Sequence, residues 1–358
     1  MSREVLAPPL LRMDNNRCYR VNLVHDDFSS QQAIAVQKKG QTKKVYMEED
    51  LYGEDYNDEL DVEGDCDIEE TSNGNFKLAM HVASSFYGGI IGFKGSTKRR
   101  IEAETHCDIS IPQKVPANKT SESHIIIKGR THNSVATARR KIQLLVSSLR
   151  KRMKATHFYG VPTNSGDIRS SFNNLKSQIM EAELPGINEE LFQSDHALHL
   201  TFGTVVLLDD VERKKAVEVL QSCREYLADL KTPFTVKVSG LEIMNDDPSS
   251  VRVLYAGVTA EELETFANRC LQRFVQSGLG FNDFGRDSVK LHMTVMNNRY
   301  REREIPDSTC KTFDAREILK RWGNFNFGSV QCNELVLCAI GSSRDVKEFY
   351  TITGSLKF

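Results

Sequence analysis

Residues 76–112 read FKLAMHVASSFYGGIIGFKGSTKRRIEAETHCDISIP, and this stretch decides the fold of the unit that it opens. Apolar residues alternate with others between Phe76 and Val82, as on a half-buried strand. Further along the chain, a polar loop and another strand lead to a long helix whose apolar residues share one face. The pattern predicts a strand at 76–82, a short glycine-rich stretch at 84–95, a helix at 96–106, strands at 109–111 and 124–128, and a helix at 131–152, in the order β-α-α-β-β-α.

The sequence Gly92-Phe93-Lys94-Gly95 links two of the predicted helices. Glycines at both ends allow a tight turn and a close approach of the backbone to a phosphate. The following helix offers backbone N–H groups and the positive end of its dipole. We therefore expect a phosphate-gripping loop here, with added charge from Lys94, Lys98, Arg99 and Arg100.

In this β-α-α-β-β-α order, the stretch from Ile90 to Pro112 resembles a KH domain of the eukaryotic type. The resemblance implies a module that clamps about four single-stranded nucleotides beside its G-x-x-G loop. One position departs from the family pattern, because Lys98 stands where an apolar residue is usual. A KH-like fold used for protein contact is the alternative. The expected nucleic-acid-binding residues are Gly92, Phe93, Lys94, Gly95, Lys98, Arg99 and Arg100.

Charge is strongly segregated along the chain, although the net charge is only −2. Residues 48–70 carry thirteen acidic residues and no lysine or arginine, whereas residues 71–154 have a balance of +12. A basic module beside an acidic segment is typical of proteins that bind polyanions. We expect residues 1–75 to be largely disordered, with a short strand at Cys18–Val24, and residues 76–154 to form the KH domain.

Residues 155–358 predict a second domain of class α+β, because helical and strand patterns are interspersed and several strand pairs are joined by short turns. Two segments of this domain echo each other. Leu198-His199-Leu200-Thr201 and Leu291-His292-Met293-Thr294 share the form L-H-[LM]-T and lie 93 residues apart. Helices are expected near 166–182, 210–230, 259–277 and 314–322, and strands near 158–162, 197–207, 234–244, 251–257, 289–297, 333–340 and 348–357.

On a strand, residues i and i+2 point to the same face, so each histidine points with its threonine. If two such strands lie side by side, they supply two imidazoles and two hydroxyls. That set suits attack at a phosphodiester: a neutral imidazole takes a proton from the nucleophile, and a protonated one gives a proton to the leaving oxygen. The threonine hydroxyls donate to the non-bridging oxygens as charge builds up. We expect His199 and His292 to face one pocket, with Thr201 and Thr294 beside them.

The two motifs resemble those of the two-histidine phosphoesterase superfamily, which includes RNA 2′,3′-cyclic phosphodiesterases. The resemblance covers 157–358 and implies a bilobal, metal-independent phosphodiesterase that needs no cofactor, with His199, Thr201, His292 and Thr294 as the catalytic residues. The sequence leaves open which histidine is the base. We interpret His196 as structural, because its odd spacing from His199 places it on the other strand face.

A KH module followed by this phosphoesterase, with the stretches 240–248 and 288–292, resembles a narrower family over residues 75–358. That resemblance implies a nuclear protein that binds single-stranded RNA or other single-stranded nucleic acid. It also implies membership of a complex with a large helicase subunit, linked to transcription and alkylation-damage repair. Two other interpretations stay open: a non-catalytic adaptor that only binds a nucleotide end, and a scaffold subunit that docks through its acidic N-terminal segment.

Neither a membrane nor a metal is expected from the sequence. No apolar run approaches the ~20 residues that cross a bilayer. The first residues lack the long apolar core of a secretory signal. The eight cysteines form no C-x-x-C pair, which predicts isolated buried thiols rather than a zinc site.

Overall fold

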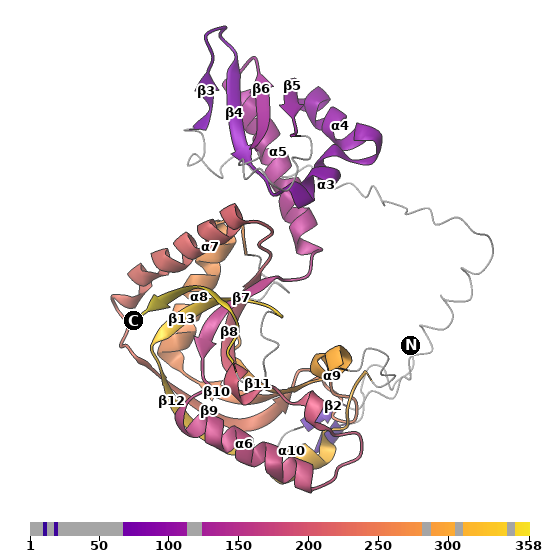
Figure 1. Ribbon diagram of the computed structural model, residues 1–358, viewed down its shortest axis with the longest axis vertical. Coiled ribbons are helices and arrows are strands. Elements are labelled where there is room, and N and C mark those ends of the chain that lie inside the picture. The colour runs from indigo at the N-terminus through magenta and orange to yellow at the C-terminus, as the bar shows by residue number, and fades with distance from the viewer. Residues whose placement is uncertain are drawn as a thin grey trace, which may run out of the picture. The chain divides into compact units, whose positions relative to one another are not determined.

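The computed structural model describes residues 10–12, 18–20, 67–112, 124–280, 288–304, 311–341 and 348–358 (Figure 1). The chain divides into two compact units, one formed by residues 23–149 and the other by residues 1–22 together with 150–358. Strands β1 (Leu10–Arg12) and β2 (Cys18–Arg20) pair with each other, and β2 occupies the first three residues of the expected strand. The rest of the segment expected to be disordered, up to residue 66, lies outside the described residues.

In its described residues, the smaller unit is an antiparallel sheet with strand order β3-β4-β6-β5 and three α-helices. Its core is mainly apolar: Ile90, Ile101, Ile127 and Val135 are all fully buried. The elements are β3 (Glu69–Glu70), β4 (Phe76–His81), η2 (Ser84–Phe86), α3 (Tyr87–Ile91), η3 (Phe93–Gly95), α4 (Ser96–Thr105), β5 (Cys107–Ser110), β6 (His124–Gly129) and α5 (His132–Lys151). The predicted order β-α-α-β-β-α is therefore present, with the short strand β3 added at the sheet edge.

The larger unit is built on an eight-stranded, wholly antiparallel sheet with strand order β12-β9-β10-β11-β8-β7-β13-β14. Four strands lie on each side of the junction between β11 and β8, which gives the sheet two lobes. The strands are β7 (His157–Pro162), β8 (His199–Val205), β9 (Phe234–Ile243), β10 (Val253–Thr259), β11 (His292–Asn297), β12 (Asn326–Cys332), β13 (Glu334–Ala339) and β14 (Ile352–Lys357).

Helices cover one face of this sheet and lie outside its curl in Figure 1. They bury one continuous apolar core, in which Phe172 of α6 and Phe266 of α8 join Leu200 and Met293 of the central strands. These helices are α6 (Gly166–Glu181), α7 (Asp210–Ser222), α8 (Glu261–Gln276) and α10 (Arg316–Trp322). Helix α9 (Asn298–Glu304) follows β11, and none of its described side chains belongs to this core. The 3-10 turns are η4 (Glu189–Leu191), η5 (Asp195–Ala197) and η6 (Cys223–Leu227). The class is α+β, as expected.

Three elements of the larger unit differ from the sequence prediction. Helix α9 was not predicted, because its sequence NRYRERE has no apolar periodicity. The helix expected over 210–230 ends at Ser222 and continues as the 3-10 turn η6. Strand β12 was not predicted, because Gly328 has a left-handed φ of 96° and shifts the pairing register beside Asn326, which interrupts the alternation of apolar residues.

Within the described ranges, no helix is long and apolar enough to cross a membrane. The five cysteines whose side chains are described are all buried and free.

Candidate active site and nucleic-acid interface

The two H-x-T motifs form the junction between the lobes of the large sheet. Strands β8 and β11 both begin at their histidine, and the one register pair between them is Leu200 with Met293. Because the strands are antiparallel, the residues that flank this pair lie side by side, with each histidine opposite the threonine of the other motif. Leu200 and Met293 are fully buried on the helix side, so all four predicted residues share the opposite face.

Both histidines are held in the same way. Nδ1–H of His199 donates to the carbonyl of Ala197 at 2.7 Å, and Nδ1–H of His292 donates to the carbonyl of Lys290 at 2.9 Å. A carbonyl oxygen only accepts, so in the neutral ring the proton sits on Nδ1 and the lone pair on Nε2. In each neutral ring, Nε2 can therefore accept a proton. The two motifs are alike in geometry as well as in sequence, because each histidine donates to the carbonyl two residues before it.

The His199 ring lies among aromatic side chains. It stacks on Phe158, with ring centroids 4.5 Å apart and planes at 27°, and Tyr350 and Phe349 meet it edge-on at 5.3 and 6.4 Å. Phe158 belongs to a small apolar cluster separate from the main core, packed by Phe349 and Tyr350. The pKa of His199 is lowered from 6.5 to about 4, chiefly by burial; the hydrogen bond to the Ala197 carbonyl opposes this shift, and the charge of the nearby His292 adds to it. His199 is therefore a neutral imidazole at physiological pH.

The His292 ring has a more polar setting. Tyr255 meets it edge-on, with ring centroids 5.2 Å apart, and is itself only 2 % exposed. The Tyr255 hydroxyl donates to the Glu242 carboxylate at 2.8 Å and accepts from the Lys290 ammonium at 2.8 Å. Lys290 also lies 3.7 Å from Glu242. Burial raises the pKa of Tyr255, so the phenol is protonated and donates as described.

The segment before β8 is held by a second polar network. Arg169 on α6 donates to Asp195 at 2.7 Å and hydrogen-bonds Nε2 of His196 at 2.7 Å. Asn164 donates to the His196 carbonyl at 2.5 Å. His196 lies in η5 rather than on the strand, which corrects the expected place on the other strand face. It is engaged in structural contacts.

Thr201 and Thr294 are half-buried on the histidine face, in register with Gly160 and Tyr255 respectively. Gly160 sits where the β7–β8 pairing shifts register, and a Cβ there would lie 2.0 Å from the Leu200 carbonyl oxygen. Only glycine allows this close approach of β7 to the first motif. Among the described residues, no group of three or more His, Cys, Asp or Glu side chains is placed to hold a metal ion.

The G-x-x-G loop in the smaller unit has a strained backbone. Its two glycine N–H groups donate within the loop region, Gly92 to the Gly88 carbonyl at 3.0 Å and Gly95 to the Gly92 carbonyl at 3.2 Å. Gly92, Lys94 and Gly95 have positive φ values of 71°, 49° and 79°. A Cβ at Gly92 would lie 2.2 Å from the Thr97 hydroxyl oxygen, so the loop turns tightly onto α4. Phe93 at its tip is 71 % exposed, and the Lys94 ammonium lies 5.4 Å from the centre of its ring.

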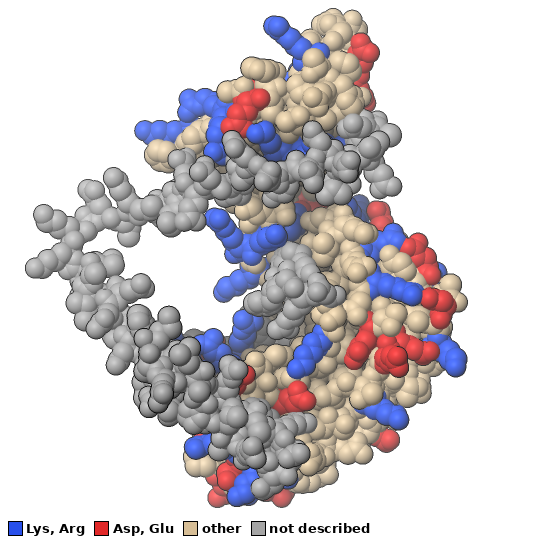
Figure 2. Space-filling model, turned by 180° about the vertical axis from the view of Figure 1, so that it is seen from behind, with Lys and Arg blue, Asp and Glu red and all other residues tan. Residues whose placement is uncertain are grey.

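The basic residues that follow the loop differ in their contacts. Lys98 forms a 2.7 Å ion pair with Glu102, whose carboxylate also accepts from the backbone N–H of Ile109. Arg99 donates to the carbonyls of Lys94 at 2.6 Å and Gly95 at 3.3 Å, so it braces the loop. Arg100 is an exposed residue of α4. In the face shown in Figure 2, basic side chains project from this unit, at the top of the view, with acidic ones among them, and the two kinds are also interspersed over the larger unit.

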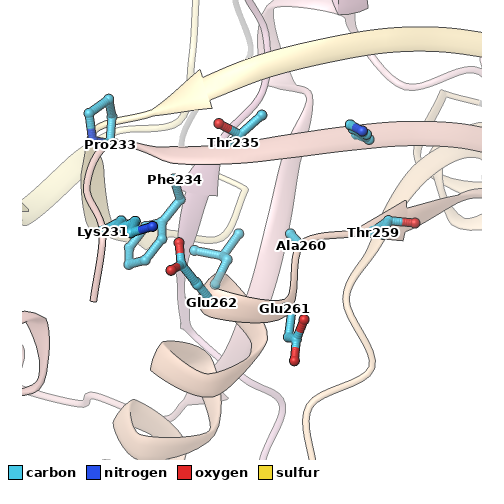
Figure 3. Close-up of a pocket in the computed structure, with 10 residues that line it drawn as sticks. Lys231, Pro233, Phe234, Thr235, Thr259, Ala260, Glu261 and Glu262 are labelled. Carbon is cyan, nitrogen blue, oxygen red and sulfur yellow. The ribbon is translucent and has the colours of Figure 1, made fainter. Parts of the chain in front are cut away.

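A surface hollow of about 370 Å³ lies elsewhere on the larger unit, between the start of β9, the end of β10 and the start of α8 (Figure 3). The charged residues of its lining are Lys231, Lys237, Glu261 and Glu262. None of the four H-x-T residues lines it, so it is separate from the predicted site.

No sequence motif marks the residues that distinguish the two histidines, which are Phe158, Glu242, Tyr255, Lys290 and Tyr350. Phe158, Glu242 and Tyr255 lie on strands other than β8 and β11, so nothing in the sequence near either motif points to them. Lys290 is the exception, because its i−2 spacing from His292 places both on one face of an extended segment.

Comparison with known proteins defines the class first. Residues 155–358 match the family model described as "AKAP7 2'5' RNA ligase-like domain", and residues 77–144 match the KH domain. The chain thus joins a KH domain to a domain of the two-histidine phosphoesterase type, as expected. Two solved structures, one described as a phosphoesterase and the other as TT0787 of Thermus thermophilus, are each 18% identical. The match to the first has a TM-score of 0.36 and spans 57% of this chain and 99% of the phosphoesterase. The match to the second has a TM-score of 0.37 and spans 56% of this chain and 97% of TT0787.

A curated relative narrows the class. The chain is 32% identical over 357 residues to mouse "Activating signal cointegrator 1 complex subunit 1", covering 93% of each sequence. The chain therefore belongs to the activating signal cointegrator 1 complex subunit 1 family.

Proposed function

We propose that this protein binds single-stranded nucleic acid through its KH domain and breaks a phosphodiester bond, without a metal, at His199 and His292. One observation carries the catalytic part: the two histidines lie on neighbouring strands, on one sheet face, each with Nδ1–H held by a backbone carbonyl. A pair of imidazoles fixed in this way suits acid–base catalysis at a phosphate.

The unequal settings of the two rings assign their roles. His199 is neutral at physiological pH and serves as the base, taking the proton of an attacking water or hydroxyl through Nε2. The new P–O bond forms as the bond to the leaving oxygen breaks, and protonated His292 gives that oxygen its proton. Thr201 and Thr294 donate to the non-bridging oxygens, where charge increases. The cycle closes when the two imidazoles exchange protons with solvent.

The KH domain holds the substrate near a weak catalytic site. The backbone N–H groups of Phe93 and Lys94 and those at the N-terminus of α4 contact the phosphates, and Lys94 and Arg100 add charge. Tethered binding raises the local concentration of the substrate. We further propose that the protein acts in the nucleus as a subunit of the activating signal cointegrator 1 complex, with a large helicase subunit among its partners. The basis is the similarity to a relative named as a subunit of that complex.

The decisive experiment uses RNA that ends in a 2′,3′-cyclic phosphate. Ring opening yields a monoester, which a phosphatase then releases as countable phosphate. We expect turnover by the full chain, and none above background by the His199→Ala, His292→Ala double variant, with RNA affinity unchanged. Binding without turnover on cyclic and linear RNAs would favour the adaptor interpretation instead. Co-purification with the helicase subunit and nuclear fractionation test the proposals on partners and location.

A further inference from the structure

His292 depends on a carbonyl in an irregular segment. Its acceptor, Lys290, precedes β11, which begins at His292 itself, so the ladder of the sheet does not hold that carbonyl in place. The bond from Nδ1–H to Lys290 is also exposed to solvent, whereas the matching bond of His199 is partly buried. Water competes for an exposed hydrogen bond, so its net contribution is small. The residues on either side are anchored, because the Val289 N–H donates to the Asn268 side chain at 2.6 Å and Leu291 is buried, but these contacts do not fix the Lys290 carbonyl itself.

The side chain of Lys290 supplies an anchor. Its ammonium donates to the Tyr255 hydroxyl, and that hydroxyl donates to Glu242, which makes a directed chain of hydrogen bonds across three segments. The chain ends on the sheet, because Glu242 and Tyr255 are register partners on β9 and β10. Tyr255 is the fixed centre of the chain, since it is 2 % exposed and its ring also touches that of His292.

The other lobe has an equivalent arrangement. The carbonyl that holds His199 belongs to Ala197 in η5, and the same turn is tied to α6 by the Arg169–Asp195 ion pair. In both lobes a charged side chain next to the acceptor carbonyl therefore fastens an irregular segment to a regular element. The residue types differ between the lobes, but in each lobe the contact holds the segment that carries the carbonyl acceptor of the histidine.

We propose that Tyr255 and Lys290 are positioning residues for His292: through Glu242 they hold the Lys290 carbonyl that keeps the imidazole proton on Nδ1. Without this chain, the Lys290 carbonyl is held less firmly, and the neutral ring exchanges between its two tautomers. The tautomer with the proton on Nε2 gives up the bond to that carbonyl, so the ring turns and Nε2 loses the orientation from which protonated His292 would reach the leaving oxygen. The kinetic consequence rests on the proposed function, but the tautomer itself does not.

The test reads the tautomer directly in the full chain. Histidine side chains labelled with ¹⁵N give different nitrogen shifts for Nδ1–H and Nε2–H, and His292→Asn assigns the signal. Near pH 8, we expect wild type to show His292 as Nδ1–H, and both Tyr255→Phe and Lys290→Met to show a mixture of tautomers. Lys290→Arg keeps a donor to the Tyr255 hydroxyl and should restore the wild-type shifts.

Tyr350→Phe is the matched control. It also removes the hydroxyl of a tyrosine that lies edge-on to a catalytic histidine, but that histidine is His199, and the hydroxyl accepts from Gln193. We expect it to leave the His292 tautomer unchanged. The His199 signal in each spectrum reports whether the domain is folded. A His292 that stays wholly Nδ1–H in either Tyr255→Phe or Lys290→Met overturns the proposal.

Kinetics form the second arm. If the protein turns over cyclic-phosphate RNA, Lys290→Met should lower kcat by on the order of tenfold, as loss of an orienting partner does for metal-bound histidines. KM should stay unchanged, and Lys290→Arg should restore kcat. If no substrate is turned over, the proposed function fails while the tautomer measurement still decides this inference.

Discussion

The low pKa of His199 gives the sharpest test of the proposed mechanism. The difference between the ordinary value of 6.5 and about 4 is about 2.5, and at 1.36 kcal/mol per pKa unit this equals about 3 kcal/mol. That free energy is the cost of protonating the ring in the folded protein relative to the unfolded chain. It arises chiefly from burial, with Phe158 stacked on one side of the ring and Tyr350 at its edge.

The sign of the pH dependence follows from linkage. The unfolded chain binds the proton with the higher pKa, so between pH 6.5 and 4 it holds more protons than the folded protein. The contribution of His199 to stability is fully present above pH 6.5 and is lost as the pH falls towards 4. The same neutral ring is the base of the proposed mechanism, so the loss of kcat/KM that comes from protonating His199 should appear only near pH 4.

Replacing Phe158 is the informative perturbation. Phe158→Ala admits water to the ring and should move the pKa of His199 up towards 6.5, so that kcat/KM declines at a higher pH on the acid side. Tyr350→Phe keeps the aromatic edge and should leave this pKa unchanged. The assay is a pH titration of the imidazole Cε1–H signals by NMR, assigned with His199→Asn. A midpoint at or above pH 6 for His199 in the free wild-type protein would refute the reasoning.

Three further outcomes are expected. Replacing Phe93 and Lys94 with two aspartates should weaken single-stranded RNA binding in a fluorescence titration. The affinity should also depend less on salt, with the log–log slope smaller by about 0.7 for each phosphate that the loop no longer neutralises. Binding equal to wild type at every salt concentration would contradict the assignment of the loop. Gly160→Ala should destabilise the larger unit by about 1–3 kcal/mol in chemical denaturation, because its Cβ would lie 2.0 Å from a backbone oxygen, whereas Gly88→Ala, with nothing within 4 Å, should be tolerated. Chelators should leave turnover unchanged, and loss of activity that zinc restores would rule out a metal-independent reaction.

Much of this protein can be predicted from its sequence because the signals are local. The G-x-x-G loop occurs within one β-α-α-β-β-α unit, where glycine positions and apolar periodicity act over a few residues. Each H-x-T motif likewise predicts a histidine and a threonine on one strand face from spacing alone. The repeated L-H-[LM]-T form around His199 and His292 predicts that the two histidines lie in one site.

What distinguishes the two histidines was decided only by the tertiary structure. The pairing of Leu200 with Met293 joins strands 93 residues apart, and no local rule specifies it. Phe158 encloses His199 because β7 lies beside β8, and Tyr255 reaches His292 because β10 lies beside β11. A pKa or a tautomer depends on which groups surround a ring, and packing places those groups there from distant parts of the chain. Two motifs that are nearly identical in sequence therefore have different chemistry in the folded protein.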